Sequence, residues 1–189
     1  MAGKGIDMEP SGKEYYSFEE WLAWGEGVRA ELYEGALIMM APPTQRHQGM
    51  LSELHGQLWQ FLKNKPCKVF PAPFGVRLSD DEDTVFEPDI VVVCDKSKLD
   101  GKVCNGAPDF VVEIVSPSTE RMDRIYKYRK YQQAGVREYW VLDPKLNLLQ
   151  AGVLMDGAYI TTVYDAEDKA PVSVLEGCVI DLADVFSEE

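Results

Sequence analysis

The sequence predicts a mixed α/β fold in which a central sheet of parallel and antiparallel strands is flanked by helices, with additional N-terminal and C-terminal β-hairpins. Short runs of β-branched and aromatic residues alternate with two segments of helical periodicity. A hydrophobic content of 46% over 189 residues is enough for one domain with a substantial core and excludes a disordered chain. We expect residues 14–189 to form this domain and residues 1–13 to be a flexible tail.

The first half of the chain contains two helices and a hairpin. Ser17-Phe-Glu-Glu20 has the pattern of a capping box, which predicts a short helix ending near Gly25. Residues 30–40 form the predicted hairpin, with its turn at Glu34-Gly35. A longer helix is expected over residues 44–63, because Thr44 is a good N-cap and the apolar residues after it recur at helical spacing.

The second half is richer in strands. A helix is expected over residues 120–134, ended by Gly135, and a hairpin across Asp156-Gly157 is expected to pair residues 148–154 with 159–164. The C-terminal segment, including residues 179–185, is expected to be peripheral. The other predicted strands are 68–78, 85–94, 110–115 and 137–142.

The composition of the chain indicates in which cellular compartment the protein is expected. The sequence contains no run of about 18 apolar residues and no apolar segment after Met1, so neither a transmembrane helix nor a secretory signal is expected. The four cysteines have no short paired spacing, so we expect reduced thiols rather than a disulfide framework or a zinc site. A cytoplasmic protein without membrane contact is therefore predicted. The cysteines are Cys67, Cys94, Cys104 and Cys178.

A net charge of −13 argues against a general polyanion binder, although one segment differs from the rest of the chain. Residues 120–137 contain six basic and two acidic residues. A basic helix in an acidic protein is usually a solvated face. Here it follows the strand that carries Glu113, so Arg121 and Arg124 are alternatively candidates for binding substrate phosphates.

Two carboxylates stand on strands that are otherwise apolar. Asp89 leads the run Ile-Val-Val-Val, and Glu113 lies inside Phe-Val-Val-Glu-Ile-Val. An unpaired buried charge costs several kcal/mol, so such groups are usually paired, metal-bound or catalytic. If the two strands are antiparallel neighbours with these residues opposite each other, paired residue numbers sum to 202 and the connection centres on Gly101.

That register would place the Cβ atoms of Asp89 and Glu113 about 4.5–5.5 Å apart on one face of the sheet. Like charges this close repel unless a cation bridges them, and Mg²⁺ or Mn²⁺ suits two carboxylates with waters and phosphate oxygens. The alternative is two partly exposed carboxylates at strand ends with surface partners.

The predicted basic helix supplies a third group. Asp123, Lys127 and Tyr131 are spaced four residues apart and share one face, so Lys127 could point back toward Glu113. A lysine there could orient an attacking water or neutralise charge on a pentavalent phosphate. Taken alone, a helical lysine is more often a solvated surface residue.

These segments resemble the PD-(D/E)XK nuclease superfamily and, more narrowly, its Uma-type restriction-endonuclease branch. The resemblance covers roughly residues 17–165 and implies a restriction-endonuclease-like core. The matching segments are Tyr33-Glu-Gly-Ala-Leu-Ile-Met-Met-Ala-Pro-Pro43, His47, Phe86-Glu-Pro-Asp-Ile-Val-Val-Val93, Ala107-Pro-Asp-Phe-Val-Val-Glu-Ile-Val-Ser-Pro-Ser118 and Ala134-Gly-Val-Arg-Glu-Tyr-Trp-Val-Leu-Asp-Pro144.

The resemblance implies that Asp89 and Glu113 bind the metal ion. A glutamate from the N-terminal region often completes such sites, and Glu31 is the better candidate, with Glu34 second. His47 could bind phosphate, lie at the metal periphery or shuttle a proton, or it could be a helix-start residue bonded to a loop.

One position departs from the superfamily pattern. The lysine expected two residues after Glu113 is replaced by Val115, which is plausible as a core residue. In the Uma-type branch this lysine has moved to the following helix, which points to Lys127 here.

The resemblance therefore implies an endonuclease that hydrolyses phosphodiester bonds in DNA with Mg²⁺ or Mn²⁺, acting as a homodimer. Two further hypotheses remain open. A catalytically silent nuclease fold could serve as an interaction or regulatory protein, with Lys127 turned away from the carboxylates. A hydrolase of a small phosphorylated molecule would fit the acidic chain better than duplex DNA does.

Overall fold

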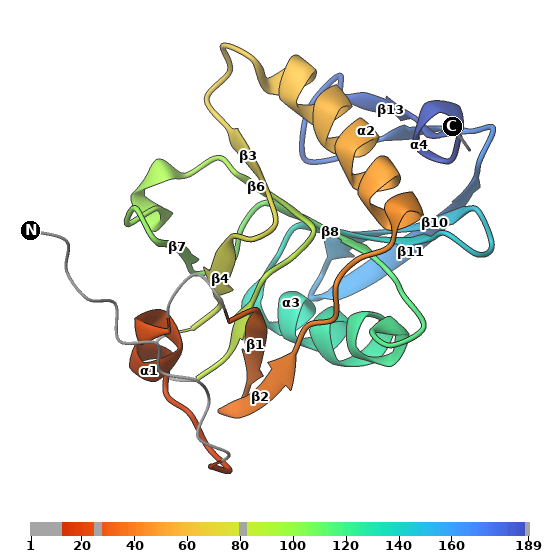
Figure 1. Cartoon of the computed structure of the whole chain (residues 1–189). Coiled ribbons are helices and arrows are strands. Elements are labelled where there is room, and N and C mark those ends of the chain that lie inside the picture. Colours follow the sequence, from red (N-terminus) through yellow and green to blue (C-terminus); the bar gives the residue numbers. More distant parts are fainter. Residues whose placement is uncertain (1–12, 25–27, 80–82, 188–189) are drawn as a thin grey trace, which may run out of the picture.

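The computed structural model describes residues 13–24, 28–79 and 83–187 (Figure 1). The predicted tail, residues 1–13, lies outside this part of the chain apart from Lys13. Most strands belong to two sheets, one with the order β11-β10-β9-β8-β6-β3 and one with the order β2-β1-β5-β4-β7. A small third sheet pairs β12 with β13.

The six-stranded sheet contains β3 (Lys68–Pro71), β6 (Ile90–Val93), β8 (Phe110–Ile114), β9 (Glu138–Asp143), β10 (Leu148–Met155) and β11 (Ala158–Asp165). The five-stranded sheet contains β1 (Ala30–Tyr33), β2 (Ala36–Met39), β4 (Gly75–Arg77), β5 (Val85–Phe86) and β7 (Val103–Asn105). The third sheet contains β12 (Lys169–Pro171) and β13 (Val179–Asp181). The helices are α1 (Phe18–Ala23), α2 (Gln45–Leu62), the 3₁₀ turn η1 (Lys96–Lys98), the π-helical segment η2 (Met122–Lys127), α3 (Tyr128–Ala134) and α4 (Leu182–Val185).

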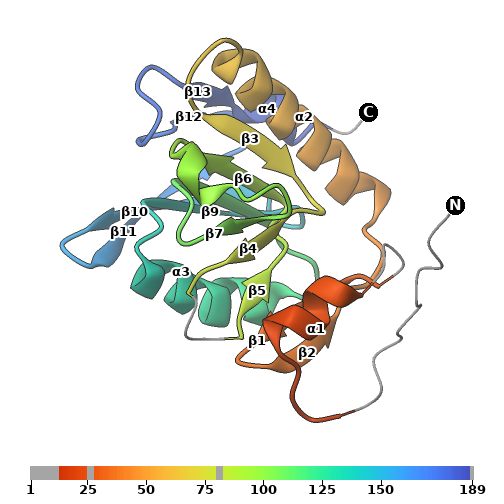
Figure 2. The same cartoon turned by 90° about the vertical axis from the view of Figure 1, so that its left-hand side faces the viewer.

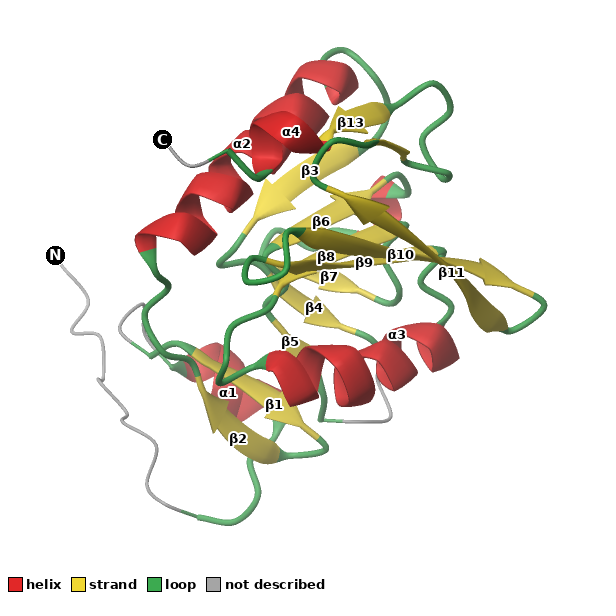
Figure 3. Ribbon diagram, turned by 90° about the vertical axis from the view of Figure 1, so that its right-hand side faces the viewer, coloured by secondary structure: helices red, strands yellow, loops and turns green. Residues whose placement is uncertain are grey.

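The predicted mixed α/β class is confirmed. In the six-stranded sheet, β8 and β9 are parallel and the other neighbours are antiparallel. Helix α2 lies on one side of this sheet, whereas η2 and α3 lie on the other (Figure 3). The side chains of β6 and β8 alternate between two core clusters, one that includes residues of α2 and one that includes Tyr131 of α3.

The helix ends form where the sequence predicts them. Ser17 and Glu20 make a complete capping box at α1, and the Thr44 side chain accepts a hydrogen bond from the backbone N–H of His47 at the start of α2. Helix α2 buries residues at a spacing of four, which packs one stripe against the sheet. Gly135 ends α3 with a φ of 86°, a conformation that glycine adopts without strain.

Both predicted hairpins are confirmed. Positive φ angles occur at both residues of each two-residue turn, Glu34-Gly35 and Asp156-Gly157, as twisted hairpins require. The hairpins are not appendages, however. β1 and β2 form one edge of the five-stranded sheet, and β10 and β11 extend the six-stranded sheet (Figure 2).

Two predicted long strands are each divided between the two sheets. The strand predicted over residues 68–78 is β3 and β4, separated by the cis Ala72–Pro73 bond, and the strand over residues 85–94 is β5 and β6, separated by Glu87-Pro88. Proline has no N–H for the ladder, so each strand ends there and the chain crosses to the other sheet. β7, within a predicted loop, was also missed.

The C-terminal segment is not peripheral, contrary to prediction. Ile180, Leu182 and Val185 are buried in the same core cluster as the inner face of α2. The side chain of Gln57 on α2 also exchanges two hydrogen bonds with the backbone of Asp181, at 2.9 and 3.2 Å. The apolar pattern of this short segment did not reveal that α2 has an apolar surface against which the C-terminal residues pack.

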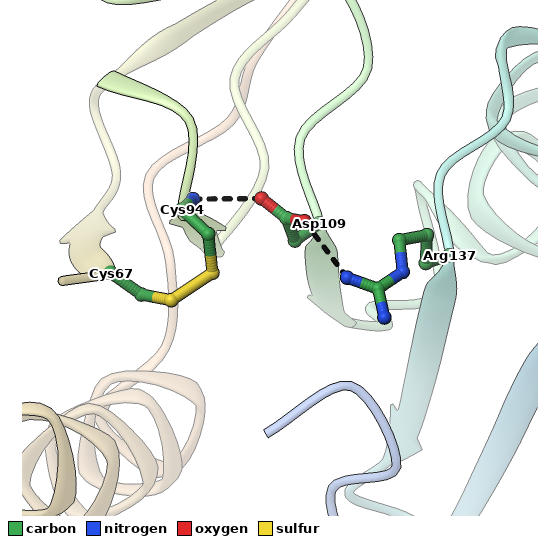
Figure 4. The surroundings of a disulfide bond; sticks show 4 residues. All are labelled: Cys67, Cys94, Asp109 and Arg137. Atoms are coloured by element: carbon green, nitrogen blue, oxygen red, sulfur yellow. Dashed lines mark hydrogen bonds and ion pairs between the residues drawn. A yellow bond between two sulfur atoms is a disulfide. The ribbon is translucent and has the colours of Figure 1, made fainter. Parts of the chain in front are cut away.

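The prediction of reduced cysteines is wrong for one pair: Cys67 and Cys94 form a disulfide (Figure 4). Lys68 pairs with Val93 in the antiparallel β3–β6 ladder, so the two cysteines are the next cross-strand neighbours. Their separation of 27 residues concealed this contact, because it depends on strand register rather than local spacing. Asp109 caps the same strand end, accepting a hydrogen bond from Cys94 N at 2.7 Å (Figure 4).

Within the described ranges, we find no helix whose length and apolar character would let it cross a membrane.

Candidate active site

Strands β6 and β8 bring the two predicted carboxylates together. They pair antiparallel with Val91 opposite Val111, so paired residue numbers sum to 202, as predicted. Asp89 directly precedes β6 and is therefore opposite Glu113. Oδ2 of Asp89 accepts a hydrogen bond of 2.7 Å from the backbone N–H of Ile114, which anchors the carboxylate to the neighbouring strand.

Strand alternation directs both carboxylates to the same side of the sheet. Even-numbered residues such as Ile90 and Val112 belong to the cluster under α2, whereas Val91 and Val111 belong to the cluster under α3. Asp89 and Glu113 are odd-numbered, so they face η2 and α3.

Lys127 lies at the centre of the site, at the end of the π-helical segment. Its Nζ is 2.8 Å from Glu31 Oε1, 2.9 Å from Glu113 Oε1 and 3.4 Å from Asp123 Oδ1. Its side chain is only 4% exposed. The predicted orientation of Lys127 toward Glu113 is confirmed, which contradicts the outward-facing lysine expected of a purely structural protein.

Two tyrosines donate hydrogen bonds to residues of the Lys127 cluster. Tyr131 donates a hydrogen bond of 3.2 Å from its hydroxyl to Glu113 Oε1, and Tyr139 donates one of 2.9 Å to the backbone carbonyl of Asp123. Both tyrosines are buried, so hydrogen bonds in a water-poor environment connect α3 to β8 and η2 to β9.

The N-terminal glutamate of the site is Glu31 rather than Glu34. Glu31 is buried on β1, and its Oε1 accepts hydrogen bonds from Lys127 and from the backbone N–H of Glu87 at 2.8 Å each. Glu34 is in the exposed turn and pairs with Lys130 at 2.8 Å. Of the two candidates, Glu31 is therefore the one that lies within the cluster, and its role as a metal ligand stays a prediction.

His47 joins the site from the first turn of α2. Its Nε2 is 3.2 Å from Asp89 Oδ2, so this contact connects the first turn of α2 to the residue that precedes β6. Burial opposes protonation of His47, but the hydrogen bond and the charge of Asp89 outweigh it and raise the pKa of the imidazole. Nδ1 of His47 is buried without a hydrogen-bond partner in the described part of the chain.

The pKa shifts in the site reflect an excess of carboxylates over ammonium groups. Burial raises the pKa of Glu113 well above its usual value, with Lys127 opposing and the carboxylates of Asp123, Asp89 and Glu31 adding to the rise. Burial alone would lower the pKa of Lys127, but the surrounding carboxylates raise it well above its usual value. Lys127 therefore stays charged, and the site favours additional positive charge.

The predicted phosphate-binding arginines differ in availability. The Arg124 guanidinium is bonded to Asp143 and Gln150 at 2.6 Å each and to Glu120 at 3.1 Å, so it links η2 to β9 and β10 instead of pointing into the site. Arg124 is therefore engaged by protein side chains in this structure, and its role as a phosphate ligand stays a prediction. Arg121 is exposed at the start of the helix, with its guanidinium 5.7 Å from the Tyr126 ring centre.

Two further acidic residues border the site. Asp123 was predicted to share the face of Lys127, but its role as a fourth carboxylate of the cluster was missed, although its i,i+4 spacing to Lys127 was the available signal. Glu87 lies between Phe86 and Pro88, and its Oε2 is buried without a hydrogen-bond partner among the described residues. No pattern in the sequence distinguished Glu87 from an ordinary surface residue.

The donor set fits a divalent cation bound mainly through Asp89 and Glu113. Hard oxygen ligands with water and substrate completing the shell are what Mg²⁺ prefers. No three acidic, histidine or cysteine side chains in the described ranges are grouped to hold a metal ion by themselves. Glu31 is hydrogen-bonded to Lys127, so this geometry does not support the expectation that it is a third ligand.

Comparisons with known proteins agree with the observed fold. The uncharacterized protein slr1290 of Synechocystis sp. is 25% identical over 157 residues, which cover 80% of this chain and 81% of that protein. The crystal structure of "a putative nuclease belonging to DUF820" from Anabaena variabilis has the same fold, with a TM-score of 0.74 and 21% identity over 90% of this chain and 97% of that one. Residues 14–183 match the family Uma2, described as "Putative restriction endonuclease". The chain therefore belongs to the Uma2 family.

Proposed function

We propose that this protein is a Mg²⁺- or Mn²⁺-dependent endonuclease that hydrolyses phosphodiester bonds in DNA. The observation that carries the proposal is the position of Lys127, a buried ammonium between Glu113 and Glu31 on the face of the sheet that also receives Asp89. A structural ion pair needs one carboxylate, whereas this lysine is surrounded by three.

Asp89 and Glu113 would hold the metal ion, because they are side by side on adjacent strands and carry the oxygen ligands it requires. When bound, the ion would act as a Lewis acid on the phosphate and lower the pKa of an attacking water. Lys127 would place positive charge against the scissile phosphate as charge develops on its oxygens.

The remaining residues position these groups. Glu31 and Asp123 hold Lys127 from two sides, which limits the directions in which its ammonium can point. His47 restrains Asp89 through Nε2 and, when protonated, would add positive charge at the more exposed edge of the site. Arg121, exposed at the start of the helix, is the more accessible of the two arginine candidates for contacting a phosphate outside the cleavage position.

The net charge of −13 sets a condition on the substrate. An acidic protein binds duplex DNA poorly unless basic residues lie where the strand passes, so the affinity should fall steeply with salt if several phosphates are contacted. Hydrolysis of a small phosphorylated molecule is the second candidate, since it requires no such contacts along a DNA strand.

The test combines calorimetry of Mg²⁺ and Mn²⁺ binding with plasmid nicking, on wild type and on Asp89→Asn, Glu113→Gln and Lys127→Met. Glu53→Gln, an exposed carboxylate of α2, is the matched control. We expect the first two variants to lose both metal binding and nicking. Lys127→Met should retain metal binding and lose nicking by at least ~100-fold, the range of one electrostatic group in a transition state.

Other outcomes assign the site differently. Metal binding by the wild type without cleavage of any nucleic acid, but with hydrolysis of bis(p-nitrophenyl) phosphate, would support the small-molecule hydrolase. Absence of metal binding by the wild type would refute the nuclease and leave an interaction protein built on a nuclease fold. Equal activity in Glu113→Gln and Glu53→Gln would likewise contradict the proposal.

A further inference from the structure

Strand β11 forms one edge of the six-stranded sheet, and no strand in the described ranges pairs with its outer side (Figure 3). It is eight residues long and pairs with β10 in unbroken register from Met155–Ala158 to Leu148–Asp165. Because no bulge interrupts this register, the strand presents a regular backbone edge to its surroundings.

The free part of this edge is defined by two side chains. Gln132 accepts a hydrogen bond from the backbone N–H of Tyr159, and Asp168 accepts one from that of Asp165, at 3.3 and 2.9 Å. Antiparallel pairing makes successive residues point their N–H and C=O groups alternately toward and away from the neighbour. Odd-numbered residues of β11 therefore point away from β10.

Thr161 and Val163 lie between these two capped positions and share their outward orientation. Neither has an outward backbone hydrogen bond to any residue that the structure describes. The backbone N–H and C=O groups of Thr161 and Val163 thus have no outward partner among the described residues. The side chains of Gln132 and Asp168 bond only to the residues on either side of this pair.

Proteins usually protect such an edge with lysine, proline, a bulge or a very short strand. The other sheet edges follow this rule: β3 has four residues beginning with Lys68 and ending with Pro71, and β2 and β7 have four and three residues. β11 reads Ala-Tyr-Ile-Thr-Thr-Val-Tyr-Asp, with no basic residue and no proline. Its Ile160 and Val163 are 58% and 55% exposed, although they are apolar.

We propose that β11 is a dimerisation strand, which pairs antiparallel with β11 of a second copy of this chain about a two-fold axis through Thr162. A two-fold axis requires a self-complementary surface, and an antiparallel strand edge has that property. Only one register pairs both free residues of one copy with both free residues of the other: Thr161 opposite the partner's Val163, and the reverse. It forms four backbone hydrogen bonds.

The side chains fit the same register. Thr162 meets its own copy on one face, Ile160 meets the partner's Tyr164 on that face, and Thr161 meets the partner's Val163 on the opposite face. Pairs of β-branched and aromatic residues are favourable across antiparallel strands. No charged residue lies between Ala158 and Tyr164, so this edge avoids the repulsion that two copies of charge −13 would meet elsewhere. The inference is independent of the proposed catalytic activity.

Cysteine cross-linking tests the register directly. In a non-hydrogen-bonded antiparallel pair the Cα atoms are about 4.5 Å apart, within the range that a disulfide spans. Thr162→Cys should therefore form a covalent dimer under mild oxidation. Ile160→Cys is the matched control: it is exposed on the same strand, but the two copies of residue 160 would be four residues out of register, roughly 13 Å apart.

Solution mass completes the test. We expect the wild type to have twice the chain mass by light scattering, and Val163→Lys and Thr161→Pro to have the mass of one chain. Both substitutions leave the β10 ladder intact, because the proline nitrogen would face away from it, and circular dichroism would verify folding. Leu146→Lys, at a 60% exposed apolar site in the turn between β9 and β10, should remain dimeric.

A monomeric wild type that does not cross-link at Thr162→Cys would overturn the proposal. So would a dimer that survives both β11 substitutions, because another surface would then form the interface. Equal cross-linking of the Ile160 and Thr162 cysteine variants would overturn the register.

Discussion

Replacing Lys127 with methionine removes the ammonium at the centre of a cluster of carboxylates while keeping most of the apolar stem. Nζ contacts Glu31 and Glu113 at 2.8 and 2.9 Å, distances typical of charge-assisted hydrogen bonds. Each such bond contributes about 1.5–3 kcal/mol, and breaking a buried ion pair from one side costs about 3–5 kcal/mol. The side chain is 4% exposed, so solvent screening does not reduce this cost. We expect the free energy of unfolding to fall by about 3–5 kcal/mol.

Urea unfolding, followed by fluorescence of the buried Trp140 and by circular dichroism, measures this loss. Arg129→Met is the matched control, because Arg129 is an exposed cation on α3 and should change stability by no more than about 0.5 kcal/mol. Adding Glu113→Gln to Lys127→Met should recover about 1–3 kcal/mol, since one uncompensated carboxylate is removed. A loss below about 1 kcal/mol, or strictly additive effects of the two substitutions, would refute the reasoning.

Three further predictions concern groups outside the site. Reducing the disulfide, which closes a loop of 27 residues, should lower the free energy of unfolding by about 3–4 kcal/mol, measured with and without dithiothreitol; no difference would contradict this. Burial raises the pKa of the Cys104 and Cys178 thiols to about 11, so at pH 8 neither should react with a thiol reagent until the protein unfolds, when both should be titrated. Burial also raises the pKa of Glu138, whose contribution is complete below its unfolded value near ~4.3 and is lost as pH rises through the higher folded value. The free energy of unfolding of the wild type should therefore fall relative to that of Glu138→Gln from pH 4 to pH 7, and a difference that does not change with pH would disprove the assignment.

Strand register was the most accurate prediction from sequence. The hypothesis that Asp89 lies opposite Glu113 needed only one carboxylate on each of two apolar strands and a loop centred on Gly101 between them, which are local properties. The orientation of Lys127 followed from helical spacing alone. These inferences succeeded because the residues involved are joined by short connections.

Features that depend on distant parts of the chain were not predicted. The long strands divide near Pro73 and Pro88 because one half of each pairs in a second sheet. No local sequence pattern predicts that second sheet. Pairing of Cys67 with Cys94 and the capture of Arg124 by Asp143 depend on which strands become neighbours. Sequence-based prediction of the site therefore succeeded for contacts within one hairpin or one helix. It failed for contacts that depend on how the two sheets meet.

The number of residues between Lys127, at the end of η2, and Tyr131, in α3, is critical for the candidate site. Residues 122–127 contain wider turns than an α-helix, and Lys127 is the last of them. Returning η2 to ordinary α-helical turns would absorb the deletion of one of its residues, whereas deleting one residue of α3 before Tyr131 would rotate everything after it by roughly 100° about the helix axis. Tyr131 would then leave Glu113, although no buried side chain had been substituted. Surface loops of homologous proteins can gain or lose residues freely during evolution, whereas this helix should conserve its residue count even where its identities drift.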